Sequence, residues 1–329
     1  MLSNIFNVKR TAKRGTWLWR RVALPLLLAL LAFGFVGLGT GLASSSAPLR
    51  PATVSSQQAD AAPAMMVWNG TLYVGWTGRN AAHNLNLMTY TPNSKVFGPA
   101  QVLTDTTLPG QGPSLVNFKG NLYVAWMGSD HRLNVGRYDP AHPSVLADKV
   151  TLRESSNQAP ALAAFQGRLY LSWRGTDGHL NIISSADAST FTTKVTYGVV
   201  VRTSPSLVAK NMVLFVAWEE MSASSHIVFA RYDPAQPTDL QDVVTVASTS
   251  QLPIGLAPAG VASPYVVVAW RTATDAHVRT AIFEGGPFLH HPVYTAETTN
   301  YGPALYSPYM SWTGTDAAQS INVSVAGIF

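Results

Sequence analysis

The sequence contains no cysteine among its 329 residues, and only 12% of its residues are charged. The absence of cysteine excludes disulfide bonds and thiolate chemistry, so the packing of side chains must stabilise the fold. The charged fraction is about half of that in an average globular protein. Hydrophobic residues make up 47% of the chain, which is enough to form a large core. This composition is typical of extended β-structure whose outer faces carry Thr, Ser and Asn.

Acidic residues are missing from the first 50 positions, although the whole chain has a formal charge of +5. The seven basic residues of that stretch are Lys9, Arg10, Lys13, Arg14, Arg20, Arg21 and Arg50. From residue 51 onward, 15 basic residues stand against 17 acidic ones, which gives a formal charge of −2. The part of the chain that is expected to fold therefore lacks the basic surface of a nucleic-acid-binding protein, and we expect no nucleic-acid partner.

An uncharged, mostly apolar stretch occupies residues 22–43, directly after the first basic residues. Its length suits a membrane span, and the small residues before Ser44 also fit a signal-peptide cleavage site. Two alternatives stay open for residues 1–43, a cleaved signal peptide and a retained N-terminal membrane anchor. Both place the rest of the chain outside the cytoplasm, extracellular or at the cell surface, because the basic side stays inside. Residues 44–50 are expected to be a short linker.

A tryptophan recurs along the chain at intervals of 50, 47, 45, 52 and 42 residues. The positions are Trp76, Trp126, Trp173, Trp218, Trp270 and Trp312. A nearly fixed period of this length indicates one supersecondary unit that is repeated along the chain. Because the apolar residues of each tryptophan strand alternate onto one face, we expect these tryptophans to lie in the core rather than to bind a ligand.

Each repeat has the features of four antiparallel strands. A proline, which is tolerated at the first residue of a strand, lies 9 to 13 residues before each tryptophan. These prolines are Pro63, Pro113, Pro160, Pro205, Pro258 and Pro303. Turn pairs such as Asn69-Gly70 separate the first strand from the tryptophan strand. A loop of the type Trp-x-Gly-Thr-Asp then leads to a third strand, and a further segment such as 149–152 supplies the fourth.

Four strands in each repeat, with no helical periodicity after residue 50, predict an all-β, six-bladed β-propeller over residues 51–329. The sixth repeat ends after its third strand, at Phe329. Residues 50–56 resemble the fourth-strand segments and precede Pro63 as those segments precede the other prolines. We therefore predict that this N-terminal strand completes the last blade, which closes the ring and removes the exposed edges.

Residues 160–181 show the repeat in its clearest form, Pro-Ala-Leu-Ala-Ala-Phe-Gln-Gly-Arg-Leu-Tyr-Leu-Ser-Trp-Arg-Gly-Thr-Asp-Gly-His-Leu-Asn. This pattern resembles the repeats of bacterial sialidase-like propellers and of bacterial propeller lectins. The resemblance implies a propeller whose loops bind glycan. A sialidase-type enzyme would also have an arginine triad and Asp-box turns. The nearest Asp-box, at residues 185–191, lacks the glycine, and no Arg-Ile-Pro motif opens the first repeat, so the resemblance favours the lectins.

The loops between second and third strands are expected on one face of the propeller, opposite the tight hairpins, where binding residues are commonly found. Their carboxylates are Asp130, Asp177, Asp275 and Asp316. A histidine recurs near the end of the loop in five repeats, at His83, His131, His179, His226 and His277. Either each imidazole bonds a nearby loop carboxylate and stabilises the turn, or the loops form a ring of equivalent polar sites. We expect no metal or other cofactor, because imidazoles on different blades should lie too far apart to share an ion.

The residue after the tryptophan is charged in three successive repeats, as Arg174, Glu219 and Arg271. These residues are expected to form either an ion-pair network between blades or a charged pocket near the central channel that holds a carboxylate. Two flanking arginines should lower the pKa of Glu219. A glycosidase needs a second carboxylate, and the candidates are Glu220, Asp177 and Asp275.

Three functions stay open. The first, our lead expectation, is an exported propeller that binds a glycan or an extracellular protein ligand through its Gly-Thr-Asp loop face without catalysis. The second is a sialidase-like glycoside hydrolase that uses Glu219 or Glu220 with Arg174 and Arg271. The third is a structural or protein-docking propeller. The expected ligand-binding residues are Arg174, Asp177, His179, Glu219, Arg271, Asp275, His277, Asp130, His131 and Asp316.

Overall fold

The computed structural model describes residues 52–260 and 263–325. The expected signal or anchor segment, the linker and the first two residues of the expected N-terminal strand lie outside the described residues. Within the described ranges, no helix is long and apolar enough to span a membrane.

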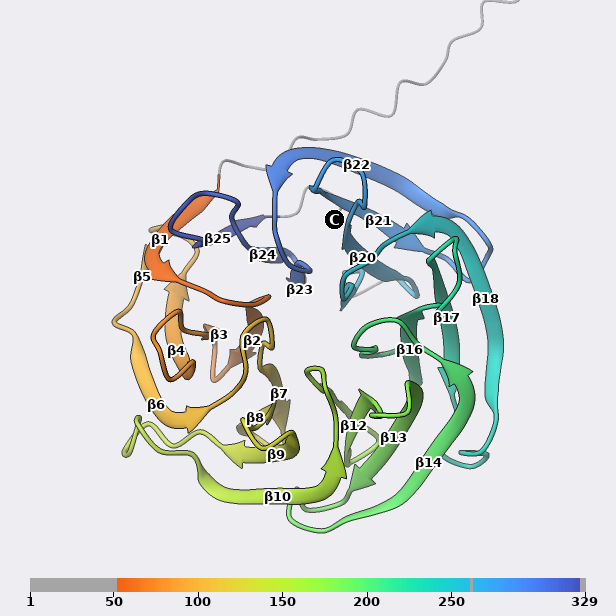
Figure 1. The fold of residues 1–329 in the computed structure, drawn as a ribbon, viewed down its shortest axis with the longest axis horizontal. Helices are drawn as coiled ribbons and strands as arrows, with labels where there is room; N and C mark the ends of the chain where they lie inside the picture. Colours follow the sequence, from red (N-terminus) through yellow and green to blue (C-terminus); the bar gives the residue numbers. More distant parts are fainter. Residues whose placement is uncertain (1–51, 261–262, 326–329) are drawn as a thin grey trace, which may run out of the picture. The chain divides into compact units, whose positions relative to one another are not determined.

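The described residues form six antiparallel sheets around a common axis (Figure 1). The all-β, six-bladed propeller predicted from the sequence is confirmed. The first sheet contains β2 (Ala64–Trp68), β3 (Thr71–Thr77), β4 (Asn84–Thr91) and β6 (Gln101–Thr106). The second contains β7 (Ser114–Phe118), β8 (Asn121–Met127), β9 (Arg132–Arg137) and β10 (Ala147–Ser155). The third contains β11 (Ala161–Phe165), β12 (Arg168–Arg174), β13 (His179–Ser185) and β14 (Phe191–Val200). A short strand, β5 (Val96–Phe97), also pairs with β4.

The other three sheets repeat this arrangement. The fourth contains β15 (Ser206–Lys210), β16 (Val213–Glu219), β17 (His226–Tyr232) and β18 (Leu240–Thr249). The fifth contains β19 (Gly255–Pro258), β20 (Val266–Arg271), β21 (His277–Phe283) and β22 (Leu289–Thr298). The sixth contains β23 (Ala304–Tyr306), β24 (Tyr309–Thr313), β25 (Ser320–Val325) and β1 (Thr53–Gln58). The first strand of each sheet lies next to the axis, and the fourth strand lies on the outer rim (Figure 1).

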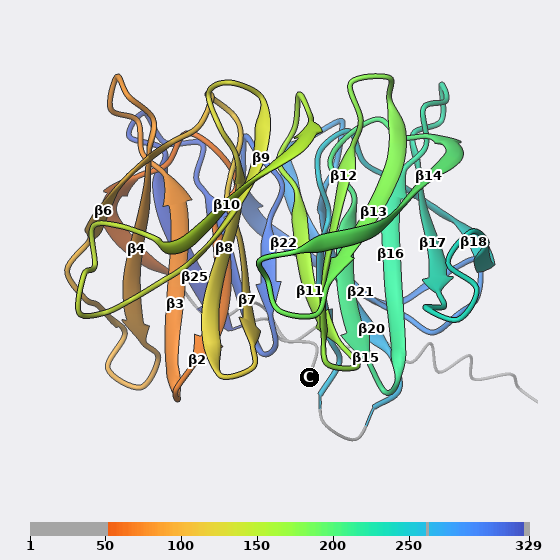
Figure 2. The same cartoon turned by 90° about the horizontal axis from the view of Figure 1, so that it is seen from below.

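Tight hairpins join the first and second strands of most sheets. Asn69 and Gly70, for example, have φ angles of 48° and 75°. Positive φ at both central residues defines the two-residue turn that matches the twist of the flanking strands, which explains the glycine at the second position. Figure 2 shows these hairpins on one face of the propeller and the loops between second and third strands on the opposite face.

The recurring tryptophans form the seams between sheets, with exposed fractions of 1% to 6%. Trp173 of β12 packs in a cluster with Leu133 and Val135 of the preceding sheet. Trp76 of the first sheet packs with Ile321 and Val323 of β25. The prediction that the tryptophans belong to the core is therefore confirmed, and the same contact that joins neighbouring sheets also closes the ring.

The sixth sheet contains one strand from near the start of the described chain. β1 pairs antiparallel with β25, with Thr53 opposite Val323 and Val54 opposite Asn322. Arg79 of the first sheet also reaches this sheet, because its Nη1 donates hydrogen bonds to the carbonyl oxygens of Ala317 and Ala318 at 3.0 and 3.3 Å. These contacts join the two ends of the described chain.

The expected position of one proline is wrong. Pro258 is the last residue of β19, where it lies opposite Val266, and does not open the strand. The connection from Pro258 to Val266 is longer than the other hairpins, so the distance back from Trp270 no longer marks the start of the sheet. Ile254 precedes β19, and Pro253 lies one residue earlier.

Candidate functional site

The aspartates of the Gly-Thr-Asp loops hold the backbone of their own turns. Oδ1 of Asp130 accepts a hydrogen bond from the backbone N–H of Arg132 at 3.0 Å, and Oδ1 of Asp177 accepts one from His179 at 3.1 Å. Oδ1 of Asp275 accepts one from His277 at 3.1 Å, and Oδ1 of Asp316 accepts one from Ser320, four residues further along the chain, at 3.0 Å. This is the local side-chain-to-backbone bonding for which Asp is favoured in turns.

The glycine of the loop makes room for this carboxylate. A Cβ atom added to Gly128 would lie 2.7 Å from Oδ1 of Asp130 and 3.0 Å from Nδ2 of Asn134. That Asn134 nitrogen donates to the carbonyl of Arg132 at 2.9 Å. The recurring Gly, Asp and Asn therefore form one hydrogen-bonded unit, and the shape of the turn accounts for the motif.

The five histidines occupy two different backbone positions, so they do not form a ring of equivalent sites. His83 and His131 have positive φ angles of 50° and 65° within the loop. By contrast, His179, His226 and His277 are the first residues of β13, β17 and β21. Nδ1 of His83 lies 3.0 Å from Oδ2 of Asp60. Nδ1 of His131 lies 3.3 Å from the carbonyl oxygen of Ser156.

The other three histidines pair with the carboxylates of their own loops. Nδ1 of His179 lies 3.3 Å from Asp177, and Nδ1 of His277 lies 3.3 Å from Asp275. The expected contact between an imidazole and its loop carboxylate is thus confirmed for these two histidines and wrong for His131. Within the described ranges, no group of three or more His, Cys, Asp or Glu side chains is arranged to hold a metal ion.

Arg174, Glu219 and Arg271 do not pair with one another. Nε of Arg174 donates to the carbonyl oxygen of Val201, and Nε of Arg271 donates to that of Thr299, both at 2.8 Å. Each guanidinium therefore bonds the backbone of the segment that follows the fourth strand of its own sheet. The expected ion-pair network is absent from the described residues: both guanidinium groups bond backbone carbonyls, and Glu219 is buried against Thr203.

The environment of Glu219 is the reverse of the expected one. Its exposed fraction is 1%, and its Oε2 accepts a hydrogen bond from the hydroxyl of Thr203. Burial raises the pKa of Glu219 from 4.5 to about 8, although Thr203, Ser250 and the charge of Arg202 act in the opposite direction. The expectation of a lowered pKa is wrong because desolvation outweighs the neighbouring positive charge.

Glu220 lies apart from this buried carboxyl, as expected for adjacent residues in extended backbone, whose side chains point to opposite faces. Its Oε1 accepts a hydrogen bond from the hydroxyl of Ser222 at 2.7 Å and lies 3.1 Å from Nδ1 of His226. Glu220 thus takes the place of the loop aspartate in the fourth sheet. The two glutamates therefore bond different partners among the described residues.

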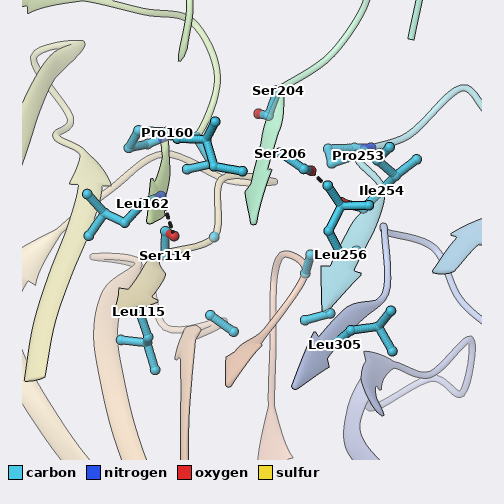
Figure 3. Close-up of a pocket in the computed structure, with 18 of the residues that line it drawn as sticks. Ser114, Leu115, Pro160, Leu162, Ser204, Ser206, Pro253, Ile254, Leu256 and Leu305 are labelled. Carbon is cyan, nitrogen blue, oxygen red and sulfur yellow. Dashed lines mark hydrogen bonds between the residues drawn. The ribbon is translucent and has the colours of Figure 1, made fainter. Parts of the chain in front are cut away.

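A cavity of about 720 Å³ lies along the axis, inside the ring of first strands. Its apolar wall includes Leu115, Leu162, Leu256 and Leu305, which come from different sheets (Figure 3). Hydrogen bonds join neighbouring first strands around the wall. Ser114 accepts from the backbone N–H of Leu162 at 3.0 Å, and Ser206 donates to the carbonyl of Ile254 at 2.5 Å (Figure 3).

The polar end of this cavity is formed by the lead-in segments, which we define as the residues that join a fourth strand to the first strand of the next sheet. Their polar side chains on the cavity are Gln111, Gln158, Arg202, Thr203, Ser204 and Gln251. The backbone N–H of Arg202 bonds the carbonyl of Glu219 at 2.9 Å, at the end of the second strand. The polar end therefore lies on the same face as the Gly-Thr-Asp loops.

The side-chain amides at this end differ in how many of their atoms form hydrogen bonds within the protein. Oε1 of Gln111 accepts from the backbone N–H of Ala159 at 2.7 Å, while the Nε2 of Gln158 donates to the carbonyl of Arg202 at 3.3 Å. The side chain of Gln251 is exposed and forms no hydrogen bond with any other described residue. Oε1 of Gln158 also accepts a hydrogen bond from the hydroxyl of Ser204 at 3.5 Å, so among the described amides at this end the groups left for a ligand are the nitrogen of Gln111 and the side chain of Gln251.

Sequence reasoning missed this cavity. The expected ligand-binding residues follow the tryptophans or lie in the Gly-Thr-Asp loops, and none of them lines the axial cavity. The sequence feature that could have indicated the polar end of the cavity is the residue two positions before a strand-opening proline, such as Gln158 before Pro160 or Thr203 before Pro205. Their polar character varies from repeat to repeat, whereas the turn residues recur.

Comparison with known proteins finds no matching family model and no matching curated protein. Solved structures share the fold. The GH93 α-L-arabinofuranosidase of Fusarium graminearum, solved with arabinobiose, has a TM-score of 0.61 and 13% identity, over 84% of this chain and 96% of its own. An α-L-arabinofuranosidase from Clostridium thermocellum has a TM-score of 0.50 and 14% identity, over 74% and 96% of the two chains. AofleA from Arthrobotrys oligospora has a TM-score of 0.57 and 11% identity, over 82% and 81%.

At these identities the likeness shows the fold alone. The chain is a six-bladed β-propeller whose structural neighbours include glycoside hydrolases. The narrower resemblance to sialidase-like repeats stays a prediction from the sequence.

Proposed function

We propose that this protein is an exported propeller that binds a glycan, without hydrolysing it, in the axial cavity on its Gly-Thr-Asp loop face. The observation that carries the proposal is the cavity itself, which combines an apolar wall of leucines with a polar end of amides and hydroxyls. Its volume of about 720 Å³ lies in the range of small-molecule sites. Sugar rings have both C–H faces, which can contact the leucines, and hydroxyl groups, which can bond the polar end of the cavity.

The absence of carboxylates favours binding over hydrolysis. Among the described residues that line the cavity there is neither an aspartate nor a glutamate. Glycosidases of the common type need two carboxyl groups on either side of the scissile bond. Glu219 is the nearest candidate along the chain, and it lies behind Thr203 rather than on the cavity wall.

The solved neighbours are consistent with a saccharide ligand, since one of them was crystallised with arabinobiose. Export is supported by the apolar stretch at residues 22–43, which follows a basic segment. Localisation outside the cytoplasm therefore belongs to the proposal together with glycan binding.

A glycan array probed with the labelled propeller tests the binding, and a panel of fluorogenic glycosides tests the chemistry. We expect saturable binding to a subset of glycans and no turnover. Turnover that is abolished by Glu219→Gln or Glu220→Gln would replace this proposal by the hydrolase. Failure of binding and turnover together would leave a structural or protein-docking propeller.

A further inference from the structure

Arg202 is the one side chain lining the axial cavity that is charged at neutral pH, among the residues that the structure describes. It lies in the lead-in segment before β15, next to Thr203. The remaining polar groups of the wall are amides and hydroxyls. The electrostatic character of the cavity is therefore determined by one guanidinium.

This guanidinium is only partly satisfied by the protein. Its Nη2 donates to the carbonyl oxygen of Ser222 at 2.7 Å, which orients the side chain. Its Nε is buried and has no hydrogen-bond partner. No ion pair among the described residues includes Arg202. Nη1 forms no hydrogen bond with any other described residue, which leaves it for an acceptor in the cavity.

The nearby carboxyl does not neutralise Arg202 at neutral pH. Glu219 has a pKa of about 8 because it is buried, so it is mostly protonated there. The cavity therefore keeps a positive charge at its polar end. Charge-assisted hydrogen bonds to arginine are stronger than neutral ones, and a carboxylate matches the planar guanidinium best.

Resting on the proposed function, we propose that the saccharide bound in this cavity carries a carboxylate, as in a glycan with uronic or other acidic sugars, and that this group pairs with Arg202. The amide nitrogen of Gln111 and the amide of Gln251 then bond sugar hydroxyls. The leucine wall contacts the apolar face of the ring.

The experiment compares acidic glycans with their own methyl esters. An array of neutral and acidic oligosaccharides is probed with the full propeller, and each acidic hit is then titrated calorimetrically as the free acid and as the ester. We expect acidic glycans to dominate the hits and esterification to weaken binding by about tenfold or more, the effect of losing a charge-assisted bond. The variant Arg202→Gln should bind the acid and the ester equally.

The matched control is Arg153→Gln, which removes the same charge from an exposed position on β10 and should keep the wild-type preference. Circular dichroism and thermal unfolding show whether each variant is folded. Equal binding of acid and ester, or hits confined to neutral glycans, would overturn the carboxylate inference while glycan binding stands. An array without any hit would overturn both proposals.

Discussion

The hydroxyl of Thr203 donates a hydrogen bond to Oε2 of Glu219, so a buried carboxyl lies one hydrogen bond behind the wall of the axial cavity. The contact links the cavity to the core of the fourth sheet. Because burial raises the pKa of this carboxyl to about 8, its protonation bears on the stability of the fold and on the charge near Arg202.

The first prediction is a pH-dependent stability that comes from Glu219. The unfolded chain releases this proton near pH 4.5, while the folded protein keeps it up to about pH 8. The free energy of unfolding should therefore fall as the pH rises across this window, by up to about 1.4 kcal/mol per pH unit. Glu219→Gln should remove this part of the slope, as measured by urea unfolding across the same window. Glu220→Gln is the control and should keep it; a wild-type slope in Glu219→Gln would contradict the assignment.

The second prediction concerns the Gly-Thr-Asp turn. Gly128→Ala places a methyl group against the Asp130 carboxylate, so it should lower the free energy of unfolding by about 1–3 kcal/mol. In the Asp130→Ala background the same change should cost less, because the obstructing carboxylate is gone. Denaturant unfolding of the four proteins completes the cycle. Additive costs would show that the carboxylate is not the obstacle.

A third prediction separates the turn from the ligand site. Asp130→Ala should leave glycan affinity unchanged, because this carboxylate is bonded to its own turn and does not line the cavity. Ala161→Trp should abolish binding by filling the cavity at the start of β11. The control Ala273→Trp adds the same ring to an exposed loop position and should bind normally. Calorimetric titration measures all three; loss of affinity in Asp130→Ala would return the site to the loops.

The fourth prediction tests how the ring closes. A chain that begins at Ala61 lacks β1 and leaves β25 as an open edge, so it should unfold at a lower temperature and self-associate. A chain that begins at Ala52 should behave as the full propeller. Since the shorter chain also loses Asp60, the variant Asp60→Asn in the longer chain separates the two effects. Differential scanning calorimetry and size-exclusion chromatography are the measurements, and equal melting temperatures would exclude a stabilising role for β1.

The repeat was predictable because strand pairing within a sheet is local. Hydrophobic alternation, a turn pair such as Asn69-Gly70 and the spacing of the tryptophans all act within one repeat of the chain. They specify hairpins of adjacent strands, and burial of Trp173 or Trp76 then requires a neighbouring sheet. The one misplaced strand start, at Pro258, arose where a longer connection changed the local spacing.

The chemistry of the charged residues was not predictable in this way. Whether Arg174 meets Glu219 or a backbone carbonyl depends on how successive sheets are rotated about the axis, which no spacing along the chain records. The pKa of Glu219 depends on desolvation by groups from several segments, and this outweighed the positive charges that the sequence places nearby. The axial cavity exists only because residues from six lead-in segments converge, so the chain's linear order specified the sheets while their closure into a ring created the candidate site.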